Sequence, residues 1–175
     1  MIDDGSTDDS SNIGQNYANQ YDNIEYYRIP NQGLGHARNY GLKFVNGDYV
    51  TFLDSDDIIP PKAYELMYKA ALRNNSDVVM GSVWRFNSKK TWYSDIHEIA
   101  FNNDKECTHI RESNEIIYDT IACNKLIRKS FWDENNFSFP EGRYYEDIPV
   151  IIPNTAHADT TQIINNIISL LNFIL

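Results

Sequence analysis

The sequence predicts an α/β domain with a mostly parallel sheet flanked by helices. Three observations together favour a single domain of this class. Short apolar runs of strand length, such as YVTFL at 49–53, alternate with segments whose apolar residues recur every three or four positions. The chain of 175 residues is long enough to bury one core of ordinary size. No internal repeat, low-complexity segment or linker interrupts it, so we expect a single domain over 1–175.

The elements of the first half are predicted from clear local signals. Ser6 or Thr7 can cap the first helix, because their hydroxyl oxygens accept hydrogen bonds from a first helical turn. Asn46-Gly47 ends a second helix, and Pro60-Pro61 opens a third. In chain order we expect a strand end at 1–4, a helix over about 8–20, a strand at 24–29, a helix at 37–45, a strand at 49–53 and a helix with its apolar residues at 63–71.

The second half carries weaker signals. Two prolines fall in its last predicted helix: Pro149 is tolerated in a first turn, whereas Pro153 should bend the helix. In chain order we expect a strand at 77–84, a strand pair or long loop at 90–108, a helix at 111–120, a strand at 121–128, a helix at 144–159 and a β-prone tail from Thr161 onward.

Composition excludes several classes of function. The chain has 25 Asp and Glu against 15 Lys and Arg, a net charge of -10, which argues against binding to nucleic acids or to anionic membranes. Cys107 and Cys123 are too few for a disulfide framework and lack the spacing of metal ligands, so we expect buried free thiols. No signal peptide is visible, and the apolar stretch from Ile163 to Leu175 is too short to span a bilayer. These features predict a cytoplasmic protein.

Two acidic clusters follow predicted strands, Asp3-Asp4 and Asp54-Ser55-Asp56. Ligands of open α/β sheets bind beyond the carboxyl ends of the strands, which favours a site there, although Asp and Ser are also common turn formers. Neither an EF-hand loop nor a glycine-rich phosphate loop fits the sequence. Asp54 and Asp56, one residue apart, would point to the same side. Their oxygens suit Mg²⁺ or Mn²⁺, which would link an acidic protein to an anionic ligand.

Four segments in order carry a family resemblance. IDDGSTDDS, NQGLGHARNYGL and GDYVTFLDSDD, within residues 1–84, resemble the nucleotide-binding half of glycosyltransferase family 2, whose members have the GT-A fold. NKLIRKSFWDENNFSFPEGRYYEDIPV, within residues 85–175, resembles the acceptor half of bacterial members that decorate teichoic acids, capsules and exopolysaccharides. The resemblance implies a Rossmann-like GT-A sheet, a nucleotide-diphosphate sugar donor such as a UDP-sugar, Mg²⁺ or Mn²⁺, and a carbohydrate or polyol-phosphate acceptor.

On the donor side, the resemblance implies roles for five residues. Asp4 would bind the uracil or ribose, and Asp3 would support the turn that carries it. Arg38 would lie near the nucleotide and its diphosphate, with a surface arginine as the alternative. Asp54 and Asp56 would form the DxD motif, in which Asp56 contacts the metal and Asp54 the ribose or sugar, beside the same metal.

On the acceptor side, Asp147 would be the general base. It would take a proton from the acceptor hydroxyl, which attacks the anomeric carbon in line and inverts it. The alternative is an ordinary acid at a helix start. Lys125 and Arg143 would line the acceptor site. The four histidines match no motif, so we expect them to be solvated or to cap helices.

Both ends of the chain depart from the family pattern. Met1 and Ile2 stand directly before Asp3, so the usual first strand-helix unit is lacking, and the chain stops soon after Asp147. We therefore expect a fragment truncated at both ends, which self-associates through an exposed sheet edge and, in a full-length parent, lies at the inner face of the membrane. Alternatives are a catalytically dead remnant or nucleotide-sugar-binding module, a nucleotidyltransferase, and an Asp-rich interaction domain.

Overall fold

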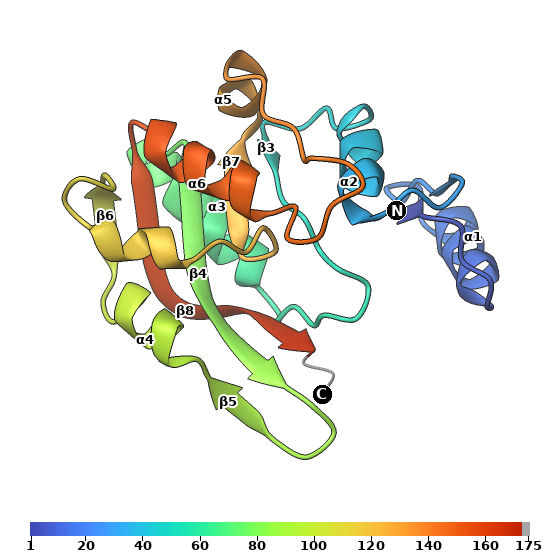
Figure 1. Cartoon of the computed structure of the whole chain (residues 1–175), viewed down its shortest axis with the longest axis horizontal. Helices are drawn as coiled ribbons and strands as arrows, with labels where there is room; N and C mark the ends of the chain where they lie inside the picture. Colours follow the sequence, from blue (N-terminus) through green and yellow to red (C-terminus); the bar gives the residue numbers. More distant parts are fainter. Residues whose placement is uncertain (173–175) are drawn as a thin grey trace. The chain divides into compact units, whose positions relative to one another are not determined.

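The structure, a computed structural model, describes the backbone of residues 1–172 and most of their side chains. It divides into two compact units. The first unit comprises Met1–Asn46 and Ser138–Pro149, and the second comprises Gly47–Phe137 and Val150–Leu175. Figure 1 follows the chain from blue at its N-terminus to red near its C-terminus.

The first unit is a small parallel pair of strands with two helices. It contains β1 (Ile2–Asp3), α1 (Ser10–Gln20), β2 (Tyr27–Arg28) and α2 (Leu34–Leu42). Strand β1 pairs with β2 in parallel, with Ile2 opposite Tyr27. The ring of Tyr27 stacks on Phe44 at a centroid distance of 4.0 Å, which covers one side of this pair with aromatic surface. Helix α2 begins after Gly33, whose φ of 91° suits glycine.

The second unit is built on a six-stranded mixed sheet. The strand order is β3-β7-β4-β8-β6, and β5 pairs with β4. Strand β4 pairs with β8 in parallel but with β7 and β5 antiparallel, and the pairs β3–β7 and β6–β8 are also antiparallel. The strands are β3 (Tyr49–Val50), β4 (Val78–Phe86), β5 (Thr91–Tyr93), β6 (Lys105–Thr108), β7 (Lys125–Arg128) and β8 (Thr161–Asn172).

Helices cover both faces of this sheet. Figure 1 shows α3 on one side of β4 and α6 on the other. Met67 and Ala71 of α3 pack with Val79 of β4 and Leu126 of β7, all almost fully buried, because helical spacing places the apolar residues of α3 on one face. The helices of this part are α3 (Ala63–Asn74), α4 (Asp95–Ala100), the 3₁₀ helix η1 (Asn114–Tyr118), α5 (Lys129–Glu134) and α6 (Ile148–His157), which begins at the end of the first unit.

The predicted α/β class is confirmed, but several local expectations need correction. The large sheet is mixed and not mostly parallel, since four of its five pairings are antiparallel. The helix expected at 111–120 is the short η1, and the helix expected from 144 begins at Ile148. Helix α5 was not expected. The β-prone tail forms β8, and the last part of that expectation, 173–175, lies outside the described residues.

Two further expectations concern cysteines and membranes. Cys123 is a buried free thiol, as predicted, whereas the side chain of Cys107 lies outside the described ones. Within residues 1–172, no helix has the length and apolar character needed to cross a membrane.

Candidate functional site

Asp3 is the last residue of β1 and begins the acidic turn that follows the strand. Its carboxylate accepts hydrogen bonds from the Ser6 N–H at 2.7 Å, the Ser11 hydroxyl at 2.5 Å and the Tyr26 hydroxyl at 2.5 Å. Burial alone would raise the pKa of Asp3, but these hydrogen bonds outweigh it and hold that pKa below its ordinary value. The carboxylate therefore stays ionised and ties the turn to α1 and to the segment before β2.

Asp4 lies on the same turn and is half-buried. One of its oxygens accepts the N–H of Gln32 at 2.9 Å, and the other accepts the N–H of Gly33 at 2.8 Å. These bonds join the turn to the loop that enters α2. A carboxylate oxygen has a second lone pair, so Asp4 retains acceptor capacity for a ligand.

Arg38 of α2 holds two acids from the other segment of the first unit. Its guanidinium donates to Glu146 Oε1 at 3.1 Å and to Asp147 Oδ1 at a shorter distance, and it lies 5.1 Å from the ring centroid of Phe139. The Arg38 side chain is 6% exposed, so the alternative of a surface arginine is wrong. The Asp147 side chain keeps 20% exposure, which leaves it accessible on one side.

The segment that carries these acids is anchored on α2. The Asn39 side chain donates to the Phe139 carbonyl at 2.8 Å and accepts the Phe139 N–H at 2.8 Å. Glu141 contacts Asn39 and His36, each at 3.1 Å. A Cβ on Gly35 would come within 2.4 Å of the Pro140 carbonyl oxygen, so only glycine fits there. Arg143, which follows these anchored residues in the chain, is exposed to solvent.

In the second unit, the DSDD turn after β3 meets a buried thiol. One donor atom each from Asp54, Asp57 and Cys123 lies within 4.8 Å of the others. The sequence predicted the pair Asp54 and Asp56, but in the described part of the chain Asp56 is exposed and does not join this group. Two carboxylates suit a hard divalent cation, so the donor set fits Mg²⁺ or Mn²⁺ through Asp54 and Asp57.

Lys125 belongs to a buried polar network. Its side chain is 0% exposed, and its ammonium donates to Asp119 Oδ2 at 2.8 Å, the Ile121 carbonyl at 2.6 Å and Asn124 Oδ1 at 3.0 Å. Asn124 in turn donates to Asp119 and to the Gly81 carbonyl of β4. All three ammonium protons therefore have partners, and, contrary to expectation, Lys125 is not available to line an acceptor site.

His97 extends this network and corrects a second expectation. It is 3% exposed, not solvated, and its Nε2 lies 3.6 Å from Asp119 Oδ1. Burial lowers the pKa of His97, although the charge of Asp119 acts in the opposite direction. No motif signalled Asp119 or His97, because sequence alone does not show that a polar residue is buried.

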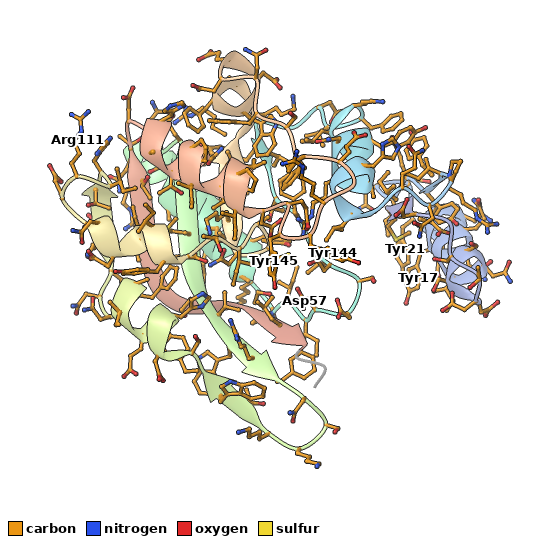
Figure 2. The ribbon with its side chains drawn as sticks, viewed as in Figure 1. Tyr17, Tyr21, Asp57, Arg111, Tyr144 and Tyr145 are labelled. Atoms are coloured by element: carbon orange, nitrogen blue, oxygen red, sulfur yellow. The ribbon has the colours of Figure 1, made fainter. Side chains whose placement is uncertain are left out.

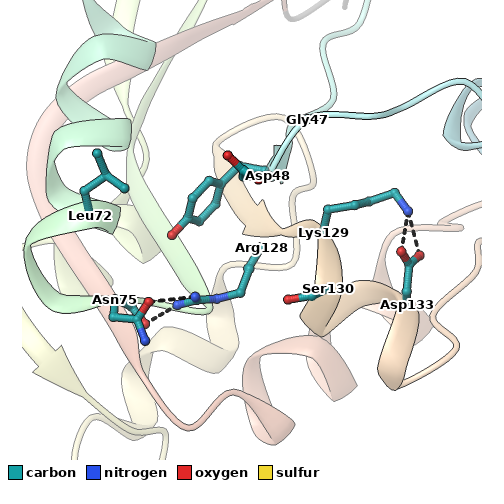
Figure 3. Close-up of a pocket in the computed structure, with 9 residues that line it drawn as sticks. Gly47, Asp48, Leu72, Asn75, Arg128, Lys129, Ser130 and Asp133 are labelled. Atoms are coloured by element: carbon teal, nitrogen blue, oxygen red, sulfur yellow. Dashed lines mark hydrogen bonds and ion pairs between the residues drawn. The ribbon is translucent and has the colours of Figure 1, made fainter.

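A pocket of about 450 Å³ lies elsewhere in the second unit, between the C-terminal end of α3, β7 and the start of α5 (Figure 3). Its cations are already paired. Arg128 bonds to Asn75 and lies 3.3 Å from Asp77, and Lys129 bonds to Asp133. None of the predicted site residues lines it.

Comparison with known proteins adds independent information. A family model described as "Glycosyl transferase family 2" matches residues 1–134. Glycosyltransferase GlyA of Streptococcus pneumoniae is 31% identical, over 84% of this chain and 22% of its own length. A poly(ribitol-phosphate) beta-glucosyltransferase of Bacillus spizizenii is 30% identical, over 79% of this chain and 21% of its own length. The chain thus spans a quarter or less of these relatives.

Solved structures share the fold. S. aureus TarS 1-349 in complex with UDP-GlcNAc superposes with a TM-score of 0.87, at 24% identity, over 99% of this chain and 49% of TarS 1-349. At this identity the likeness establishes the GT-A type of fold expected from the sequence.

Proposed function

Because the chain belongs to glycosyl transferase family 2, we propose that it acts as an inverting glycosyltransferase. The donor is a nucleoside-diphosphate sugar, and the acceptor is a hydroxyl group of a cell-surface polymer. The complex of TarS with UDP-GlcNAc supports a UDP-sugar donor, and the similarity to a poly(ribitol-phosphate) beta-glucosyltransferase supports a surface-polymer acceptor.

Asp4 and Asp54 are the proposed donor ligands. The hydrogen bonds of Asp3 fix the turn that carries Asp4, so the Asp4 carboxylate can accept from the uracil or ribose without the loop being reordered. Asp54 follows β3 at the carboxyl end of a strand, where a ligand of an α/β sheet is expected.

Asp54, with Asp57 and the exposed Asp56, would hold Mg²⁺ or Mn²⁺. When bound, the cation would neutralise the charge that develops on a departing diphosphate. Asp57 and Asp54 already lie together, while Asp56 is free to turn toward a ligand in water.

Asp147 is the proposed general base, and Arg38 positions it. The observation that carries this assignment is that a buried guanidinium holds a carboxylate which stays partly accessible. A fixed carboxylate can accept the proton of an incoming hydroxyl without paying to become ordered first. The exposed Arg143 would lie on the acceptor side, and Lys125 would support the fold of its own unit.

Calorimetry with UDP tests the proposal. We expect binding with Mn²⁺ or Mg²⁺ and little binding with a chelator, since a chain of net charge -10 needs a cation to hold a diphosphate. Asp56→Ala should remove the metal dependence, whereas Asp9→Ala, an acid next to α1, should not. Equal binding of UDP with and without metal would contradict the proposal that a cation links the protein to the diphosphate.

We also propose that the protein self-associates and that it has a particular location in the cell. Strand β3 is paired on one edge by β7, and in the ordered sheet of residues 49–172 no strand covers its other edge, which supports self-association. Gel filtration checks this, and a monodisperse monomer would contradict it. We also propose that the protein is cytoplasmic and that a full-length parent lies at the inner face of the membrane.

A further inference from the structure

Two tyrosines directly before the acid pair are almost wholly exposed. Tyr144 is 94% exposed and Tyr145 is 79% exposed (Figure 2). Tyrosine normally buries a large apolar surface, so two adjacent rings in water are unfavourable in a folded protein. Tyr145 also has a φ of 59°, a conformation that a bulky residue rarely adopts. Strain of this kind persists where a site needs a particular direction of the chain.

These rings do not lie on a loose loop. Before them, Phe139 and Glu141 are bonded to Asn39 of α2. After them, Glu146 and Asp147 are bonded to Arg38 of the same helix. The segment is therefore fixed at both ends, and the rings between the anchors are presented to solvent next to a functional carboxylate.

We propose that Tyr144 and Tyr145 form a stacking platform for a pyranose ring of the acceptor, an inference that rests on the proposed role of Asp147. A pyranose has a flat face of C–H groups that packs on an aromatic ring, while its hydroxyls reach the polar rim. An acceptor sugar held there would bring a hydroxyl close to Asp147, which lies two residues beyond Tyr145.

Charge selects the class of acceptor. The segment 138–149 carries three acids, Glu141, Glu146 and Asp147, and the exposed Arg143. Arg38 of α2 pairs with Glu146 and Asp147, so the net charge of this group is -1. A polyol phosphate adds one negative charge per unit and would be repelled, whereas a neutral pyranose would not. The platform therefore favours a saccharide acceptor over a polyol-phosphate chain.

Saturation-transfer difference NMR on the whole chain tests this proposal, with methyl β-glucopyranoside and a ribitol-phosphate oligomer as probes and UDP affinity measured in parallel. We expect transfer to the ring protons of the glucoside in the wild type. Transfer should be lost in the double variant Tyr144→Ala/Tyr145→Ala, with UDP affinity unchanged. Tyr17→Ala and Tyr21→Ala are matched controls, because Tyr17 of α1 is 50% exposed and Tyr21, directly after α1, is 44% exposed, and both should keep the signal.

Tyr145→Gly separates loss of the ring from misfolding of the chain, because glycine tolerates the positive φ while it removes the ring. It should weaken the glucoside signal without loss of thermal stability. Three results would overturn the proposed stacking platform. They are a glucoside signal that persists in the double variant, no glucoside signal in the wild type, and a glucoside signal weaker than that of ribitol phosphate. Failure of the wild type to bind UDP with metal would instead count against the proposed function. The glucoside signal would still test the stacking platform separately.

Discussion

Removal of the Lys125 charge should destabilise the second unit far more than removal of a surface charge. The Lys125 ammonium is wholly buried and is the cationic partner of Asp119, whose side chain is also 0% exposed. In Lys125→Met most of the side-chain length is kept, but Asp119 stays buried with the Asn124 amide as a hydrogen-bond donor and without its positive partner. An uncompensated buried carboxylate is among the most costly defects in a protein interior.

The expected size of the effect follows from this geometry. Loss of one partner of a buried ion pair costs about 3–5 kcal/mol. For a chain of this size that loss corresponds to a fall in Tm of roughly 6–20 °C. The double variant Asp119→Asn/Lys125→Met should recover part of the loss, because no unpaired charge is then buried.

Thermal and urea unfolding at pH 7, followed by circular dichroism, measure these changes. Lys69→Met is the control, since Lys69 pairs with Glu65 on the surface, where both side chains are more than half exposed. We expect no measurable change there. The reasoning is refuted if Lys125→Met stays within about 1 kcal/mol of the wild type, or if the double variant is no more stable than the single one.

Three further predictions concern the first unit. Gly35→Ala should destabilise it by about 1–3 kcal/mol in urea unfolding, because the new Cβ meets the Pro140 backbone, whereas Gly47→Ala has ordinary room and should not. Asp3→Asn should have a lower free energy of unfolding than the wild type at pH 7. This difference in free energy should shrink as the pH falls below 3.8 toward the lowered pKa of Asp3, because protonation then removes the advantage of the carboxylate. A difference that stays constant down to pH 2 would contradict this prediction. Asp147→Asn should slow sugar transfer by about 10²- to 10⁴-fold with UDP affinity unchanged, and Glu146→Gln should be milder; normal turnover in Asp147→Asn would make Asp147 an ordinary helix-start acid.

The sequence predicted the elements whose signals are local. The helix over 63–71 and the strand from 77 correspond to α3 and β4, because their apolar spacing reflects real burial. Strand direction has no such signal, so the antiparallel pairing of β4 with β7 was not foreseen. Helix α5 begins at Lys129, directly after β7 ends at Arg128, so no turn residue marks its start.

Motifs in the sequence indicated several acids of the candidate site but not the residues with which they pair. The acids at positions 3, 4, 54 and 147 were identified from motifs. Their partners were not, because Arg38 and Asp147 are 109 residues apart and no periodicity connects them. Cys123 and Lys125 show that the sequence also does not reveal burial. The Cys123 thiol lies beside two acids, and Lys125 has no exposed surface, but nothing in the local sequence of either residue indicates this.

The discontinuity of the first unit has a consequence for how the chain acquires it during synthesis. The ribosome releases α2 long before the segment that pairs with it, since Asp147 follows Arg38 by 109 residues. At a synthesis rate of about 5–20 residues per second this delay is on the order of 5–20 s. Throughout that interval the guanidinium of Arg38 and the Asn39 amide have no partners from the later segment, while the intervening β4 can already pair with β5 and β7. Nascent chains arrested shortly before residue 138 should therefore expose α2 to protease, and chains arrested well after residue 149 should protect it.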